Sequence, residues 1–361
     1  MEETVEKQLY IACSTGNIDL INQLLQSNPN ININYQNNSE WNKTPFFIAC
    51  QQGHIEVIKL FLRPHFYNRI DVNKLDKDER TPFWSACYHG RIEIVKLLLD
   101  DERIDVNKVE NQYSRTPLWI ACANKHNDVV KLLLKYEQVD RNKGNKYLES
   151  PLYTACYKGL VEIMKSLLHY KRVNVNQVES NDRTPFYAAC LSGSIEAVTL
   201  LLNDPRVEVN RGDMNDQTPF YVACSYGHLG VIRLLLDDER VDINLAERNG
   251  WTPLFFVCFQ TQSEVVEYIL ACRREVDLSA RNIDGKSAID VVSERQKDEK
   301  GFWEKEKDYK AKIKRCGKIV KLLESYERNS CETRTKLRIQ LGFAGKINFN
   351  LFYFIFYFGL T

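Results

Sequence analysis

The feature that most constrains this chain is a Thr-Pro pair that returns at nearly constant spacing. The pair occurs six times, and Ser150-Pro151 fills the one gap in the series. Successive copies are separated by 37, 35, 34, 34, 34 and 34 residues. A period of this length is typical of a solenoid, whose core grows along one axis, so the length rule for globular domains does not apply. The threonines are Thr44, Thr81, Thr116, Thr184, Thr218 and Thr252.

A second marker follows each of these pairs at a fixed distance. Five residues after each Thr or Ser comes an Ala-Cys pair, which becomes Val257-Cys258 in the last copy. Ala12-Cys13 extends the series backwards to a first copy that has no Thr-Pro. The sequence therefore predicts eight copies of one unit.

Each copy predicts the same pair of helices. Thr or Ser suits an N-cap, and Pro is favoured at the first helical position. The small Ala-Cys pair lets a neighbouring helix approach, and a Gly then ends the helix in a left-handed conformation. Residues 92–99 carry apolar side chains at helical spacing, and an extended Asp105-Val106-Asn107 follows. We expect an all-α solenoid of helix-turn-helix units joined by extended, β-hairpin-like loops.

This pattern resembles the ankyrin repeat family over about residues 5 to 285. The family's Thr-Pro-Leu-His-x-Ala-Ala is similar to Thr81 through Cys87, its Gly-His to Gly90-Arg91, and its Asp-Val-Asn to Asp105 through Asn107. The resemblance implies an ankyrin-repeat solenoid that binds a protein on its concave face, through the loop tips and the exposed ends of the first helices.

The chain departs from the family pattern at recurring positions. Cys replaces the second Ala, and Lys125 and Thr261 stand where other copies have the inter-helix Gly. An aromatic residue replaces the family's His in every copy, so we expect ring packing between repeats in place of that residue's hydrogen bonds. These aromatics are Tyr10, Phe47, Trp84, Trp119, Tyr153, Tyr187, Tyr221 and Phe255.

Three regions follow from this register. Residues 1–285 hold eight repeats, of which the first is a capping repeat. Residues 286–327 hold a degenerate ninth repeat with a charged helical insert, which we interpret as a solvated extension of its helices, with a docking element as the alternative. Residues 328–361 form a tail with an apolar aromatic segment at 351–360. This segment is interpreted as a membrane anchor, as a segment that packs on the last repeat, or as translated non-coding sequence.

Catalytic and metal-binding patterns are missing from the sequence. Eight of the eleven cysteines recur at one repeat position, where helix spacing of about 8–10 Å is too wide for a disulfide or a shared zinc. The histidines form no HExxH or HxH group, and His54, His126 and His228 occupy the family's Gly-His position. We expect no enzyme, no cofactor and no metal site.

Charge and composition bound the class of partner. The net charge is +1 with both signs interspersed, which gives no reason to expect a nucleic acid. The first residues show no secretory signal, and eleven cysteines without one favour a reducing compartment. We expect a monomeric cytoplasmic protein, with the nucleus as the alternative location.

Candidate binding residues come from the family's contact positions. Aromatic residues and Arg are enriched at binding hot spots. Arg80, Arg115 and Arg183 lie directly before a Thr. The hypothesis is an adaptor or scaffold that receives an unidentified protein in one groove, and the same module held at a membrane by residues 351–360 is the alternative. The alternative interpretation of these positions is that they are solvated loops whose aromatic residues have no binding role. The groove residues are Trp41, Tyr88, Tyr113, Tyr147, Tyr157 and Tyr226.

Overall fold

The computed structural model describes residues 4–301 and 305–343, which form two compact units that divide between Pro185 and Phe186. These described residues contain nineteen α-helices, two short 3-10 helices and no strand. Their one isolated β-bridge joins Asn37 and Lys43 in a loop. The expectation of an all-α solenoid is confirmed.

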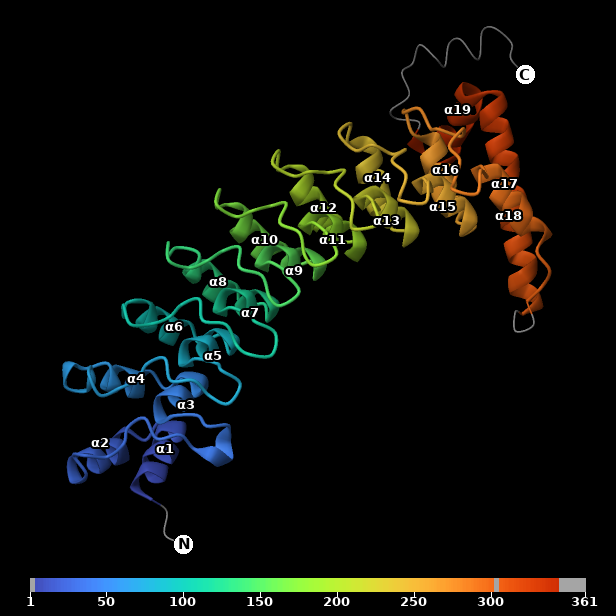
Figure 1. Cartoon of the computed structure of the whole chain (residues 1–361). Helices are drawn as coiled ribbons and strands as arrows, with labels where there is room; N and C mark the ends of the chain where they lie inside the picture. Colours follow the sequence, from blue (N-terminus) through green and yellow to red (C-terminus); the bar gives the residue numbers. More distant parts are fainter. Residues whose placement is uncertain (1–3, 302–304, 344–361) are drawn as a thin grey trace. The chain divides into compact units, whose positions relative to one another are not determined.

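The first unit stacks its helical hairpins in two rows (Figure 1). The first helices contact one another in the order α1, α3, α5, α7, α9, and the second helices in the order α4, α6, α8, α10. The elements are α1 Val5–Thr15, α2 Ile18–Ser27, η1 Asn38–Glu40, α3 Pro45–Gln52, α4 Ile55–Phe61, η2 Pro64–Phe66, α5 Pro82–Tyr88, α6 Ile92–Leu99, α7 Pro117–Ala123, α8 Asn127–Leu133, α9 Pro151–Tyr157 and α10 Val161–Leu168.

The second unit continues the same pattern and closes with longer helices. α13, α15 and α17 pack in one row, and α12, α14 and α16 pack in the other. α18 and α19 both contact α16 and each other, so they cover the last hairpin. The elements are α11 Pro185–Ser192, α12 Ile195–Leu202, α13 Pro219–Ser225, α14 Leu229–Asp237, α15 Pro253–Phe259, α16 Ser263–Ala271, α17 Ala288–Lys297, α18 Glu306–Arg328 and α19 Ser330–Gln340.

The predicted helix starts are confirmed in atomic detail. The hydroxyl of Thr44, Thr81, Thr116, Ser150, Thr218 and Thr252 accepts the amide three residues on, at 3.0 to 3.2 Å. Each of these helices has its Pro at the first position, where the missing amide proton has no partner to lose. The Thr-Pro repeat is therefore a series of helix caps.

The cysteines of the repeat lie in the core. All eight are 0% exposed, and all eleven cysteines of the chain are free thiols. Their small side chains fill the contact between successive first helices, where a larger residue would force the helices apart. The interpretation of these cysteines as small apolar residues is confirmed.

The aromatic residues that recur at one position of the repeat also form hydrogen bonds. The indole N–H of Trp84 donates to the carbonyl of Arg115 at 2.9 Å, and that of Trp119 donates to the carbonyl of Glu149 at 2.9 Å. In the second unit, the Tyr187 hydroxyl donates to a carboxylate oxygen of Asp213 at 3.2 Å. The expectation that ring packing takes the place of hydrogen bonding is therefore wrong for Trp84, Trp119 and Tyr187, whereas the buried hydroxyl of Tyr10 has no hydrogen-bond partner.

An asparagine ladder joins the loops of successive repeats. The side-chain Nδ2 of Asn107 donates to the backbone carbonyl of Gln138 at 2.7 Å, and the side-chain Oδ1 accepts the backbone amide of Asp140 at 2.8 Å. Both ends of the side chain are thus bound to the following repeat. The same double bridge is made by Asn34, Asn73, Asn142, Asn210 and Asn244.

Another recurring bridge covers the inter-helix turn. Nε2 of His126 lies 2.8 Å from the carbonyl oxygen of Tyr88, at the end of the preceding first helix. His54 and His228 make the same contact, to Ser14 and Leu191. These histidines satisfy carbonyls that a helix end leaves without an intrahelical partner.

The irregular end is described for residues 286–301 and 305–343. α17 begins with a capping box between Ser287 and Asp290. The predicted second helix of the ninth repeat lies inside α18, which also includes much of the charged insert. Residues 330–340 form a further helix, α19, in a region for which the sequence predicted no element. The apolar segment 351–360 lies outside the described residues. No helix among those described is long and apolar enough to span a bilayer.

The asparagine ladder leads to a stability prediction. Asn107→Ala removes two hydrogen bonds between repeats and should lower the free energy of unfolding by about 1–3 kcal/mol. Asn111→Ala is the matched control, because the Asn111 side chain is exposed, and it should change stability by less than about 0.5 kcal/mol. Urea denaturation followed by circular dichroism measures both, and equal losses would contradict the ladder's role.

The inter-helix turn leads to a second prediction. Gly90 and Gly285 have left-handed φ angles of +67° and +74°, so an added Cβ strains both backbones by about 1–2 kcal/mol. At Gly90 the Cβ would also lie 2.5 Å from Nδ1 of His126, whereas nothing lies within 4 Å at Gly285. Gly90→Ala should therefore destabilise the protein more than Gly285→Ala in thermal unfolding. A smaller loss at Gly90 would show that the His126 contact contributes nothing.

Candidate functional site

A buried acidic or amide side chain holds each loop tip in shape. The Glu110 carboxylate accepts the amides of Gln112 and Tyr113 and the guanidinium of Arg115, at 2.8 to 2.9 Å. Burial alone would raise the pKa of Glu110, but the hydrogen bonds from Arg115 and the backbone keep that pKa below its ordinary value. The tip is a fixed turn around a charged centre. Asp76, Asn145, Glu179, Asp213, Glu247 and Asn282 occupy the same place in other loops.

Neighbouring tips are also bound to each other. The amide of Lys146 donates to the carbonyl of Tyr113 at 2.8 Å, and the amide of Lys77 donates to the carbonyl of Trp41 at 2.8 Å. Asn111 and Ser180 continue this series in the first unit. Because the backbones are joined at every step, the tip side chains stand in a fixed register.

The structure places the predicted site residues at two kinds of position. Trp41, Tyr113 and Tyr147 lie on loop tips, and Tyr88 and Tyr157 are the last residues of α5 and α9. Trp41 and Tyr157 are each 53% exposed, Tyr147 is 47% exposed and Tyr88 is 41% exposed. Tyr113 is half-buried. All five belong to the first unit.

Tyr113 and Tyr147 are brought together by a residue that the sequence analysis did not select. The ammonium of Lys146 lies 4.3 Å from the ring centre of Tyr113 and 5.0 Å from that of Tyr147. Lys77 stands in the same relation to Trp41, at 5.8 Å. These are cation–π contacts, each contributing about 0.5–1 kcal/mol at an exposed site. The signal was a Lys beside the predicted tip aromatic, one position before Tyr147.

Tyr88 joins this surface through Trp84. The two rings stack with centroids 5.3 Å apart and planes 19° from parallel. The guanidinium of Arg115 lies 4.7 Å from the Tyr113 ring centre and 5.9 Å from that of Trp84. We call Tyr88, Tyr113, Lys146, Tyr147 and Tyr157 the aromatic surface; the Trp84 ring, on which Tyr88 stacks, is itself buried.

The charges around the aromatic surface differ in how they are paired. The tip arginines Arg80 and Arg115 form ion pairs with the buried acids Asp76 and Glu110 of their own loops. Lys125, Lys146 and Lys158 are exposed, and the described part of the chain gives none of them an ion pair. The surface therefore presents rings together with unpaired positive charge.

The sixth predicted residue, Tyr226, belongs to the second unit. Its ring is 64% exposed and stacks on His228, with centroids 6.0 Å apart. A groove shared by all six residues stays a prediction.

The thiols of the described residues have a chemistry set by burial. Burial raises the pKa of the Cys87, Cys224 and Cys272 thiols, which disfavours the reactive thiolate. Cys331, on α19, is exposed. No group of three or more His, Cys, Asp and Glu in residues 4–301 and 305–343 could hold a metal ion.

Thiol accessibility gives a direct test of this burial. The folded chain should show one thiol that reacts rapidly with a water-soluble disulfide reagent, and Cys331→Ser should abolish that phase. Adding denaturant should release the ten remaining thiols of the Cys331→Ser variant, because they lie in the core. A second rapid thiol in the native variant would contradict the described packing.

Comparison with known proteins identifies the family of this chain. The model described as ankyrin repeats (3 copies) matches residues 9–110, 104–178, 140–213, 170–245 and 186–282. No curated protein sequence gives a significant match. Ankyrin repeats generally mediate contacts between proteins and are generally not enzymes. The matches run from residue 9 to residue 282, well over half of the 361 residues, and the chain belongs to the ankyrin repeat family.

Proposed function

We propose that this protein is a binding scaffold that holds a partner protein on the aromatic surface of its first unit. The observation that carries the proposal is that exposed rings stand on loop tips whose backbones are hydrogen-bonded to one another. Trp, Tyr and Arg are the residue types that dominate binding energy in protein interfaces. Membership of the ankyrin repeat family supports a protein-binding role, and the exposed rings support the aromatic surface as the binding position.

Rigidity supports this use of the surface. Association loses conformational entropy when side chains and loops become ordered on binding. Here the Tyr113 tip is already fixed by Glu110, and Lys146 already holds the Tyr113 and Tyr147 rings. A partner therefore has to order few side chains and loops on binding, so less of the free energy of contact is lost to conformational entropy.

The width of the surface indicates the size of the partner. Tyr147 lies before the start of α9, and Tyr157 lies at its end, so the two rings are separated by a seven-residue helix. Such a helix is about 10 Å long. A partner helix or an extended segment can span this width and contact both rings.

Loss of two rings tests the proposal. Tyr113→Ala with Tyr157→Ala should reduce recovery of the bound partner at least about tenfold in a pull-down with the full chain, because interface tyrosines commonly contribute more than about 1 kcal/mol each. Circular dichroism checks that the variant is folded.

A matched control changes the second helices. Glu56 and Glu162 are exposed on α4 and α10, where each forms a surface ion pair with Lys59 or Lys165. Such pairs contribute little to stability. Glu56→Ala with Glu162→Ala should leave partner recovery unchanged. Equal recovery by wild type and the tyrosine variant would refute the proposed surface.

A further inference from the structure

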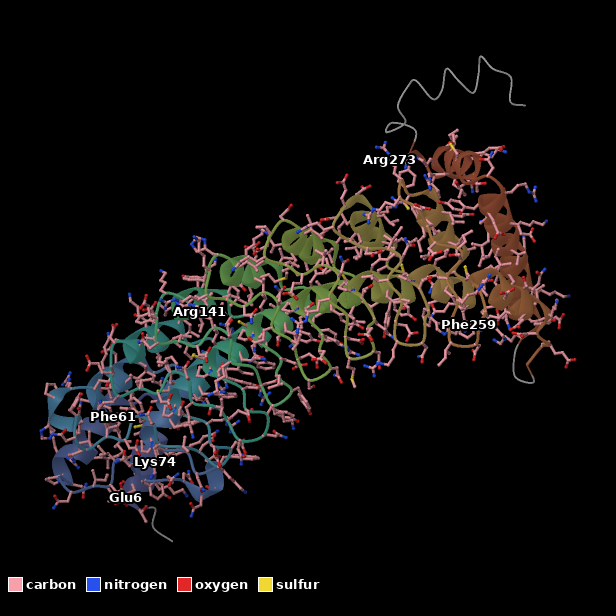
Figure 2. All side chains as sticks on the ribbon, turned by 45° about the horizontal axis from the view of Figure 1, so that its top comes forward. Glu6, Phe61, Lys74, Arg141, Phe259 and Arg273 are labelled. Atoms are coloured by element: carbon pink, nitrogen blue, oxygen red, sulfur yellow. The ribbon has the colours of Figure 1, made fainter. Side chains whose placement is uncertain are left out.

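A cavity of about 400 Å³ lies in the second unit between the ends of α14 and α16 and helix α19. Four of the residues that line it are arginines, namely Arg233, Arg273, Arg274 and Arg338. Figure 2 labels Arg273, which follows α16 by two residues. The acids on the wall are Asp237 and Glu239, so the lining carries an excess of two positive charges.

Arg338 has little compensation for its positive charge. It is half-buried on α19, and Nη1 of its guanidinium donates to the carbonyl of Ala271 at 3.3 Å. The described residues supply it with no ion pair. Burial and then the nearby Arg273 and Arg334 lower the pKa of Arg338, against the opposing effect of Asp237. A guanidinium has five N–H donors, so several of them have no acceptor among the described residues.

The neighbouring arginines are held rigidly behind it. Arg274 donates to the carbonyls of Leu235 and Leu236 at 3.1 and 2.8 Å, at the end of α14. Arg334 donates to the Tyr326 hydroxyl at 2.6 Å, and its Nε is buried without a hydrogen-bond partner. These contacts fix a concentration of positive charge next to Arg338, where mobile side chains could not be kept together against their repulsion.

We propose that this cavity binds a phosphate monoester, with the phosphate on Arg338 and Arg273. Guanidinium groups recognise phosphate through paired, charge-assisted hydrogen bonds, and clustered arginines are typical of such sites. The proposal goes beyond partner binding by the aromatic surface, because the cavity lies wholly within the second unit.

The cavity also has room and apolar walls for the group that carries the phosphate. Tyr268 and Phe343 line it, with ring centroids 5.9 Å apart at an interplanar angle of 87°. Arg233 lies 4.4 Å from the Tyr268 ring centre. Pockets that hold small organic ligands combine apolar walls with a few placed polar groups in this way. Free phosphate and a phosphorylated side chain share the chemistry of the charged end.

Calorimetric titration of the full-length chain with phenyl phosphate tests the site. Phenyl phosphate should bind, phenol should not, and binding should weaken as salt is raised. Arg338→Gln should weaken binding at least about tenfold, since it removes a charge-assisted contact. Arg338→Lys should retain part of the affinity, because it keeps the positive charge but cannot form the paired hydrogen bonds of a guanidinium.

Lys336→Gln is the matched control on the same helix. Lys336 is exposed and paired with Glu332, so this change should leave phenyl phosphate binding intact. Inorganic phosphate is the second arm. Tighter binding of phenyl phosphate supports an organic phosphate as the ligand, and equal binding supports free phosphate. No binding of either probe, or full binding by a folded Arg338→Gln variant, overturns the proposal.

Discussion

The structure depends on hydrogen bonds that each repeat can complete only with its neighbour. A single hairpin leaves the Asn side chain of its loop, the carbonyl at the end of its first helix and the indole or phenol at its core without partners. Asn107, His126 and Trp84 show how the adjacent repeat supplies those partners. An unsatisfied buried polar group is costly. The repeats therefore stabilise each other in a chain of nearest-neighbour contacts, as expected for a solenoid.

The same constraint positions the candidate binding surface. Loop tips are usually the mobile parts of a protein. Here the tip of Tyr113 is anchored from within by Glu110 and from the side by the amide of Lys146. The order that the stack needs for its own stability thus leaves aromatic side chains exposed in a fixed arrangement. The contacts that hold the stack together thus also hold the candidate binding surface in shape.

The α15–α16 hairpin departs from this logic because an irregular ninth hairpin, formed by α17 and α18, packs against it together with the additional helix α19. α19 brings Arg334 and Arg338 to the end of α16, beside Arg273 and Arg274. In the repeats, an arginine such as Arg115 is matched by an acid in its own loop. At this end the cavity lining has four arginines against two acids.

The sequence by itself determined the repeat, its helix starts and its buried cysteines, because caps, prolines and small residues act over a few positions along the chain. It also identified which aromatics occupy the tips. It could not show that Trp84 and Trp119 would keep hydrogen bonds, that Lys146 would join Tyr113 to Tyr147, or that residues 330–340 would form α19. The indole hydrogen bonds, the contact of Lys146 with Tyr113 and the cavity shared by Arg273 and Arg338 each bring together residues from 30 to 65 positions apart. Only the tertiary structure decided them, because such distant residues interact only after the helices have packed.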